Sequence, residues 1–278
     1  MSKHQQRPLR VAPVFAVVGL LLGTTAASAQ TTNDGSDSDQ KQGGLLLDIK
    51  DYYTAPLHWD LKDWAYFGGT VGLFFGARHY DEQVRTHFIK EGATPSGGST
   101  KDTKDWIPTV ATVGGTWILA NFVDSTAGHR EVGNMVEAGG FSIVTSYALK
   151  FAAGRERPNE TSDPNQWRKS GGSSFPSIHT AAAFAVGTVL AESGNDEHRI
   201  LRRFLGYGAV AGYTAFERLK HNAHWLSDDV AAAAIGAASA HFVLERDPAR
   251  QSERERSSAF TISPLPGGAM VSYNLTFK

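Results

Sequence analysis

The chain of 278 residues contains no cysteine. Disulfide bonds, thiolate catalysis and cysteine-ligated zinc or iron–sulfur sites are therefore excluded. Net charge is small as well, because 27 Lys and Arg residues oppose 28 Asp and Glu residues, which gives a formal charge of −1. Such a balance argues against a nucleic-acid partner held by bulk charge. Hydrophobic residues make up 41% of the chain, which is typical of a globular protein with a sizeable core.

Long alternation of apolar and polar residues, the pattern of half-buried strands, is scarce over most of the chain. Apolar segments with helical character dominate instead, so we expect an all-α core of about six helices. The predicted helices span residues 64–88 with a break near Gly76, 106–123, 132–153, 176–192, 200–218 and 224–245. Residues 259–278 differ, because two strand-like stretches flank a Pro- and Gly-rich turn, and this pattern predicts a terminal β-hairpin.

Residues 1–29 are predicted to form a secretory signal peptide. They combine a basic start, an apolar run at 11–23 and an Ala-Ser-Ala cleavage pattern at 27–29. Because the apolar run is shorter than the roughly 20 residues of a membrane span, we expect cleavage and a periplasmic or secreted protein. An anchor that stays attached is the alternative. Residues 30–44 are polar and are expected to be a disordered leader.

Residues 45–258 are expected to form one helical domain. Its apolar runs are interrupted by Gly, Thr, Ser and charged residues, and the mean hydropathy of the chain is −0.27. These features favour a soluble protein or one bound peripherally to a membrane. A compact membrane-embedded protein with an outward-facing site is the alternative, since helices rich in Gly and Ala also pack in lipid.

A first candidate site lies near the end of the chain, where Arg218, His224 and Asp228 follow one another. On a helix, the four-residue spacing of His224 and Asp228 places both side chains on one face. A carboxylate there can accept the imidazole N–H and leave the other nitrogen free to attack. Arg218 offers a planar fork of donors for a phosphate-type oxyanion. Alternatively, His221, His224 and Asp228 have a spacing that suits a metal ion.

Two earlier stretches carry further polar residues. Lys150 and Arg157 flank a predicted helix end, where they either converge on one anion or are ordinary surface bases. Ser177 and His179 lie at the start of the helix predicted from Pro176, where backbone N–H groups are free to bind an anion. His179 is then placed to protonate a leaving group, although a capped helix with an incidental histidine is the simpler interpretation. Residues 171–174, Gly-Gly-Ser-Ser, predict a flexible approach to this helix and lack the lysine of a P-loop.

Together, the three stretches form an ordered pattern. Lys150-x6-Arg157-Pro158 is followed by Pro176-Ser177-x-His179 and then by Arg218-x5-His224-x3-Asp228. This pattern resembles the type 2 phosphatidic acid phosphatase superfamily, which also includes bacterial class A acid phosphatases and vanadium-dependent haloperoxidases. The resemblance covers about residues 132–245 and implies a helical core.

The resemblance also implies a role for each matching residue. His224 would be the nucleophile that takes the phosphoryl group, with Asp228 as its orienting partner. His179 would protonate the departing alcohol and then activate water. The phosphoryl oxygens would be held without a metal ion or other cofactor by Lys150, Arg157, Arg218, Ser177 and the backbone N–H of Ile178. The implied activity is that of a phosphatase acting on a phosphomonoester or a lipid phosphate, and the predicted signal peptide indicates that it is exported.

Two positions depart from the pattern of the superfamily. Ile178 stands where Gly is usual, and its side chain restricts the pocket. Glu217 stands where Ser is usual, and its carboxylate could pair with Arg218 and weaken the hold of that arginine on phosphate. These departures motivate one alternative, a non-catalytic protein that binds phosphate or a lipid phosphate. A vanadate-dependent haloperoxidase, with vanadate bound at His224, is the other alternative.

Overall fold

A computed structural model describes residues 47–90, 103–194 and 196–247, and the backbone of two further segments, 260–265 and 268–273. The predicted signal peptide at 1–29 and leader at 30–44 lie outside the described residues. None of the helices in the described part of the chain combines the length and the apolar character that crossing a membrane requires.

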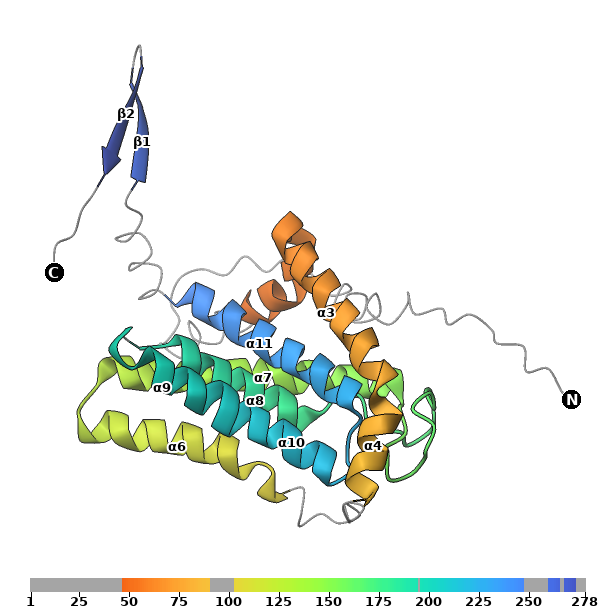
Figure 1. The fold of residues 1–278 in the computed structure, drawn as a ribbon. Coiled ribbons are helices and arrows are strands. Elements are labelled where there is room, and N and C mark those ends of the chain that lie inside the picture. The colour runs from red at the N-terminus through yellow and green to blue at the C-terminus, as the bar shows by residue number, and fades with distance from the viewer. Residues whose placement is uncertain (1–46, 91–102, 195, 248–259, 266–267, 274–278) are drawn as a thin grey trace, which may run out of the picture.

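The described domain is helical, as the sequence predicts (Figure 1). Its short helices are η1 (Ala55–His58), η2 (Asp196–His198) and α9 (Arg199–Arg203). The longer elements are α3 (Leu61–His79), α4 (Asp81–Lys90), α6 (Ile107–Phe122), α7 (Thr126–Ala153), α8 (Ile178–Glu192), the π-helical η3 (Phe204–Gly212), α10 (Tyr213–Lys220) and α11 (Leu226–Arg246).

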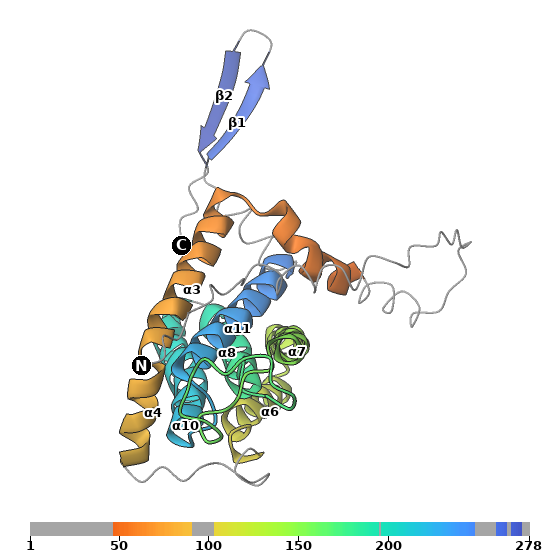
Figure 2. The same ribbon diagram turned by 90° about the vertical axis from the view of Figure 1, so that its right-hand side faces the viewer.

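Helix α8 forms the centre of the bundle and packs against α7, α11 and η3 (Figures 1 and 2). It is rich in alanine, and short side chains let neighbouring backbones come close. At Gly236 of α11, an added Cβ would lie 2.2 Å from the carbonyl oxygen of Ala181 on α8. Met135, Val186 and Leu244 fill the core between these helices. The tight packing of α7, α8 and α11 holds in place the helix ends from which the candidate site is built.

Several helix boundaries differ from the sequence prediction, among them the start of α7 at Thr126 rather than at residue 132. The helical region predicted at 64–88 does break, but at Tyr80 rather than near Gly76, because α3 continues to His79. The Tyr80 N–H donates to the carbonyl of Ala77. Helix α4 then starts at Asp81. Helix α8 begins at Ile178 rather than at Pro176, because Ser177 is its N-cap residue.

The last predicted helix also begins later than expected. His224 precedes α11, which starts at Leu226 and has Trp225 as its N-cap residue. The Oδ2 atom of Asp228 accepts a hydrogen bond from the Trp225 backbone N–H at 3.0 Å, so this carboxylate caps the start of the helix. The expectation that His224 and Asp228 share one helical face is therefore wrong: the histidine lies in the turn before the helix and the aspartate in its first turn.

The backbone of β1 (Phe260–Leu265) pairs antiparallel with that of β2 (Gly268–Tyr273), with Phe260 opposite Tyr273 and Leu265 opposite Gly268. These strands lie outside the helical core. That residues 259–278 form a stable β-hairpin stays a prediction.

Candidate active site

The first predicted stretch begins in the last turn of α7. Gly154 ends this helix in the left-handed conformation, with φ of 51°, which a residue without Cβ adopts readily. The Lys150 ammonium donates to the backbone carbonyls of Ser173 and Ser174. The Arg157 Nε donates to the Ser173 hydroxyl at 3.1 Å. Lys150 and Arg157 therefore both contact Ser173, and their convergence on one anion stays a prediction.

The segment after α7 folds back along its own start. Lys169 N–H donates to the Gly154 carbonyl at 2.8 Å, and Ser174 N–H donates to the Arg155 carbonyl at 2.8 Å. At Gly172, an added Cβ would lie 2.4 Å from the Gly154 carbonyl oxygen. The prediction of a flexible approach at 171–174 is wrong, because the backbone here is tied down and the buried Ser174 donates its hydroxyl to Asp228.

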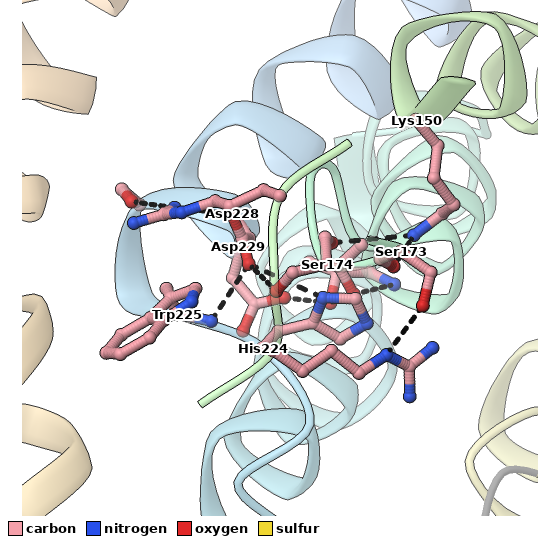
Figure 3. A network of polar contacts seen from close by, with 12 residues as sticks. Lys150, Ser173, Ser174, His224, Trp225, Asp228 and Asp229 are labelled. Carbon is pink, nitrogen blue, oxygen red and sulfur yellow. Dashed lines mark hydrogen bonds and ion pairs between the residues drawn. The ribbon is translucent and has the colours of Figure 1, made fainter. Parts of the chain in front are cut away.

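His224 and Asp228 form the centre of the site (Figure 3). Both are buried, and His224 Nδ1 lies 3.6 Å from Asp228 Oδ2. This separation is longer than a hydrogen bond, so the two groups face each other in a loose contact of the kind that tightens when a substrate binds. Because Nδ1 faces the carboxylate, Nε2 is the ring nitrogen on the side away from it.

Three cations act on the His224 ring. Burial lowers the pKa of this imidazole well below its ordinary value of 6.5, and the contact with Asp228 opposes that shift. The positive charges of Arg218, Lys150 and Arg157 lower the pKa further. A neutral imidazole at physiological pH keeps the lone pair that a nucleophile requires. The same three charges form a potential anion site next to the ring.

The neighbouring carboxyl groups differ in protonation. Burial alone would raise the pKa of Asp228, but the charge of Arg155 and the contacts with His224 and Ser174 outweigh it and hold this pKa below its ordinary value. Burial raises the pKa of Asp229 to about 7, against the hydrogen bond that Thr180 donates at 2.6 Å, and the Asp228 charge adds to the rise. Asp228 is therefore the ionised member of the pair and the one suited to support a cationic imidazole.

The second predicted stretch lies at the start of α8, where the Thr180 hydroxyl donates to Asp229. The buried Ser177 donates its hydroxyl to Thr180 Oγ1 at 2.9 Å and accepts the Thr180 N–H as the helix cap. Its side chain thus stabilises the helix start, and Ile178 is half-buried next to it. The His179 ring packs against Trp106, with ring centroids 4.6 Å apart.

Arg218 is almost fully buried at the end of α10, and its Nη1 lies 2.5 Å from Asp105 Oδ2. Asp105 precedes Trp106, so one short segment before α6 contacts both Arg218 and the His179 ring. The predicted partner of Arg218, Glu217, instead contacts Lys220 at 3.1 Å and His221 at 3.4 Å. Arg218 therefore forms its ion pair with Asp105 and not with the predicted Glu217.

The alternative metal site has no geometric support. Within the described ranges, no group of three or more His, Cys, Asp or Glu side chains is placed to hold a metal ion, and this includes His221, His224 and Asp228. His221 Nδ1 lies 3.6 Å from Asp105 Oδ2.

Sequence reasoning missed four residues of the site. Arg155 binds Asp228 at 2.6 Å and Asp81 at 2.7 Å, and all three side chains are fully buried. Ser174 and Asp105 complete the contacts to Asp228 and Arg218. The only sequence signal was the position of Arg155 between Lys150 and Arg157, since the other three stand in stretches without a motif.

Comparisons with known proteins agree with the motifs. The family model described as "PAP2 superfamily" matches residues 132–251. A lipid A 1-phosphatase from Porphyromonas gingivalis is 34% identical over 115 residues, which are 41% of this chain and 21% of that protein. The chain thus matches about a fifth of the length of this relative.

Among solved structures, the crystal structure of Aquifex aeolicus LpxE matches with a TM-score of 0.35 and 22% identity. That match covers 63% of this chain and 94% of the other. Residues 132–251 of this chain are therefore similar to the PAP2 superfamily, in agreement with the three motifs that resemble type 2 phosphatidic acid phosphatases.

Proposed function

We propose that this protein is a metal-independent phosphatase that hydrolyses a lipid phosphate or another phosphomonoester through a phosphohistidine at His224. The observation that carries the proposal is the surrounding of His224: a buried, neutral imidazole with the Asp228 carboxylate 3.6 Å behind it and three cations acting on it.

In this mechanism, His224 Nε2 forms a bond to phosphorus while the bond to the ester oxygen breaks. His179 gives its proton to the departing alcohol. It then takes a proton from the water that attacks the phosphohistidine, which releases inorganic phosphate and restores His224. Lys150, Arg157 and Arg218 stabilise the charge on the phosphoryl oxygens, and positioning with charge stabilisation is the main source of catalysis in phosphoryl transfer.

A lipid phosphate is the substrate class that two observations support. The curated relative is named as a lipid A 1-phosphatase. Large apolar side chains are also exposed on several helices, including Leu61 at 86%, Phe122 at 83% and Phe151 at 91%. Exposed apolar surface on this scale is typical of a protein that contacts a membrane or another apolar partner. We therefore propose peripheral or deeper membrane association, after export directed by residues 1–29.

The test uses purified protein with a chromogenic phosphomonoester and with phosphatidic acid in vesicles, each with and without a chelator. We expect hydrolysis that survives the chelator, is inhibited by vanadate and is abolished in His224→Ala. His241→Ala, which replaces an exposed histidine of α11, is the matched control and keeps wild-type activity. Loss of turnover with the chelator would contradict the metal-independent mechanism.

The same preparation separates the two alternatives. Oxidation of bromide by peroxide after vanadate loading, without ester hydrolysis, would identify a haloperoxidase. Phosphate binding without turnover of either ester would identify a binding protein.

A further inference from the structure

Asp228 is held on the side away from His224 by a buried arginine. Arg155 Nη1 donates to Asp228 Oδ1 at 2.6 Å, while Oδ2 of the same carboxylate faces His224. Oδ2 also accepts hydrogen bonds from the Trp225 backbone and the Ser174 hydroxyl. Each oxygen of Asp228 therefore has its own set of partners, and together these partners fix the rotation of the carboxylate.

The donors of Arg155 are fully used within the protein. Its Nη1 also donates to the Ser227 hydroxyl at 2.7 Å, and its Nη2 donates to Asp81 at 2.7 Å. Both Nη2 and Nε donate to the Pro164 carbonyl, at 2.8 and 3.1 Å. A guanidinium has five N–H donors, and these five hydrogen bonds account for all of them. Arg155 thus has no donor left for a phosphoryl group, which separates its role from that of Lys150, Arg157 and Arg218.

Asp81 anchors this arginine from a distant part of the chain. It is the first residue of α4, and its Oδ1 accepts the Ser227 N–H at 2.8 Å. Its Oδ2 accepts the Ser227 hydroxyl at 2.6 Å in addition to Arg155. Asp81 lies outside residues 132–251, the segment that the family model matches. The start of α4 is therefore joined directly to the start of α11, next to the catalytic aspartate.

We infer that Arg155, anchored by Asp81 and Ser227, is the positioning residue that holds Asp228 with Oδ2 toward His224. A guanidinium shared by two buried carboxylates is rigid, because its planar fork fixes the direction of every hydrogen bond. Its charge also keeps Asp228 ionised, in agreement with the lowered pKa of that carboxyl. This inference deepens the proposed function, on which it rests for its kinetic test.

The test compares Arg155→Gln with Arg155→Lys and with Arg202→Gln. Arg202 forms a partly buried ion pair with Glu131 away from His224, so its variant is a control for the loss of an arginine that is paired with a carboxylate. In Arg155→Gln we expect kcat to fall about 10- to 100-fold, the scale for groups that orient a functional ligand, with KM changed less than about threefold. The acid limb of the kcat profile should move to higher pH, since Asp228 loses the charge that keeps it ionised.

Arg155→Lys retains the charge without the planar fork. It should keep the acid limb at its wild-type position while restoring only part of kcat. A folded Arg155→Gln protein with the kcat and pH profile of Arg202→Gln would overturn the inference. Should Arg155→Gln fail to fold, Ser227→Ala removes only one bridging hydroxyl, for which we expect about a fivefold loss of kcat. An unchanged kcat in that folded variant would equally overturn it.

A second readout separates this inference from the proposed function. The carboxyl carbon of Asp228 reports its own titration by NMR in the wild-type protein, in Arg155→Gln and in Arg155→Lys, whether or not the protein hydrolyses an ester. We expect the pKa of Asp228 to rise in the glutamine variant and to stay low in the lysine variant. Equal titration in all three proteins would reject the positioning role, whereas an inactive wild-type protein with the expected shifts would reject only the phosphatase.

Discussion

Asp105 Oδ2 lies 2.5 Å from Nη1 of Arg218, in a contact that is almost fully buried. Arg218 is one of the three cations proposed to hold the phosphoryl group, so in this structure a carboxylate of the protein occupies one of its donors. A bound phosphate and Asp105 would then compete for the same guanidinium.

Asp105→Asn should therefore strengthen phosphate binding. Without the competing negative charge, we expect the inhibition constant of inorganic phosphate to fall about tenfold, which corresponds to about 1.4 kcal/mol. Because one partner of a buried ion pair is lost, the free protein should lose on the order of 3 kcal/mol of stability, and phosphate should restore part of it. Inhibition by phosphate and thermal unfolding with and without phosphate measure both effects. An inhibition constant that is unchanged or higher would show that Asp105 helps to bind phosphate.

The protonation of His224 should be visible in the pH dependence of stability. Burial lowers its pKa in the folded protein, so the unfolded chain takes up a proton near pH 6.5 that the folded protein does not. Stability from this group is present above pH 6.5 and is lost as the pH falls below that value. Relative to His224→Gln, the wild-type protein should therefore lose stability between about pH 7 and pH 5. A difference in melting temperature that is constant over this range would contradict a neutral buried His224.

Asp229 should make the folding stability change with pH in the opposite direction. Its pKa is raised to about 7 in the folded protein, so the folded protein binds a proton that the unfolded chain releases near pH 4. Stability from this group is present below about pH 4 and is lost as the pH rises to about 7. Asp229→Asn keeps an oxygen for the Thr180 hydroxyl and removes the titration. Its stability relative to wild type should rise with pH, by up to about 4 kcal/mol, and thermal unfolding at several pH values measures it.

The close contact of α8 and α11 predicts a steric effect at Gly236. An alanine Cβ there would lie 2.2 Å from the Ala181 carbonyl oxygen, so the helices must move apart. We expect Gly236→Ala to destabilise the protein by about 1–3 kcal/mol. Gly133→Ala is the matched control, because it is on α7 with no atom within 4 Å of the added Cβ and should stabilise by up to about 1 kcal/mol. Equal effects of the two substitutions in denaturant unfolding would argue against this packing.

The sequence predicts the helical class and the residues that converge near His224, because both depend on local patterns. Helical periodicity identifies the helices, and Lys150, Arg157 and Arg218 have the spacing of a known family. The exact starts of α8 and α11 are harder to predict from the sequence. Ser177 accepts a backbone N–H at the start of α8, so that helix begins at Ile178. Asp228 accepts the Trp225 N–H at the start of α11, and His224 therefore lies before that helix.

The residues that support the site were not predictable in the same way. Asp81 and Asp105 reach Arg155 and Arg218 only because α4 and the start of α6 fold against the ends of α10 and α11. A lone acidic residue near a helix start has an ordinary local role, so no short motif distinguishes these two. Only the folded structure shows that they neutralise buried arginines.

The most direct test of the central claim is to trap the covalent intermediate. Wild-type protein is mixed with a phosphomonoester, quenched rapidly at alkaline pH, digested and analysed by mass spectrometry. We expect an acid-labile phosphoryl group on the peptide that carries His224, and its absence in His224→Ala. Turnover of the ester with the phosphoryl group on another residue, or with no covalent adduct on His224, would contradict the account.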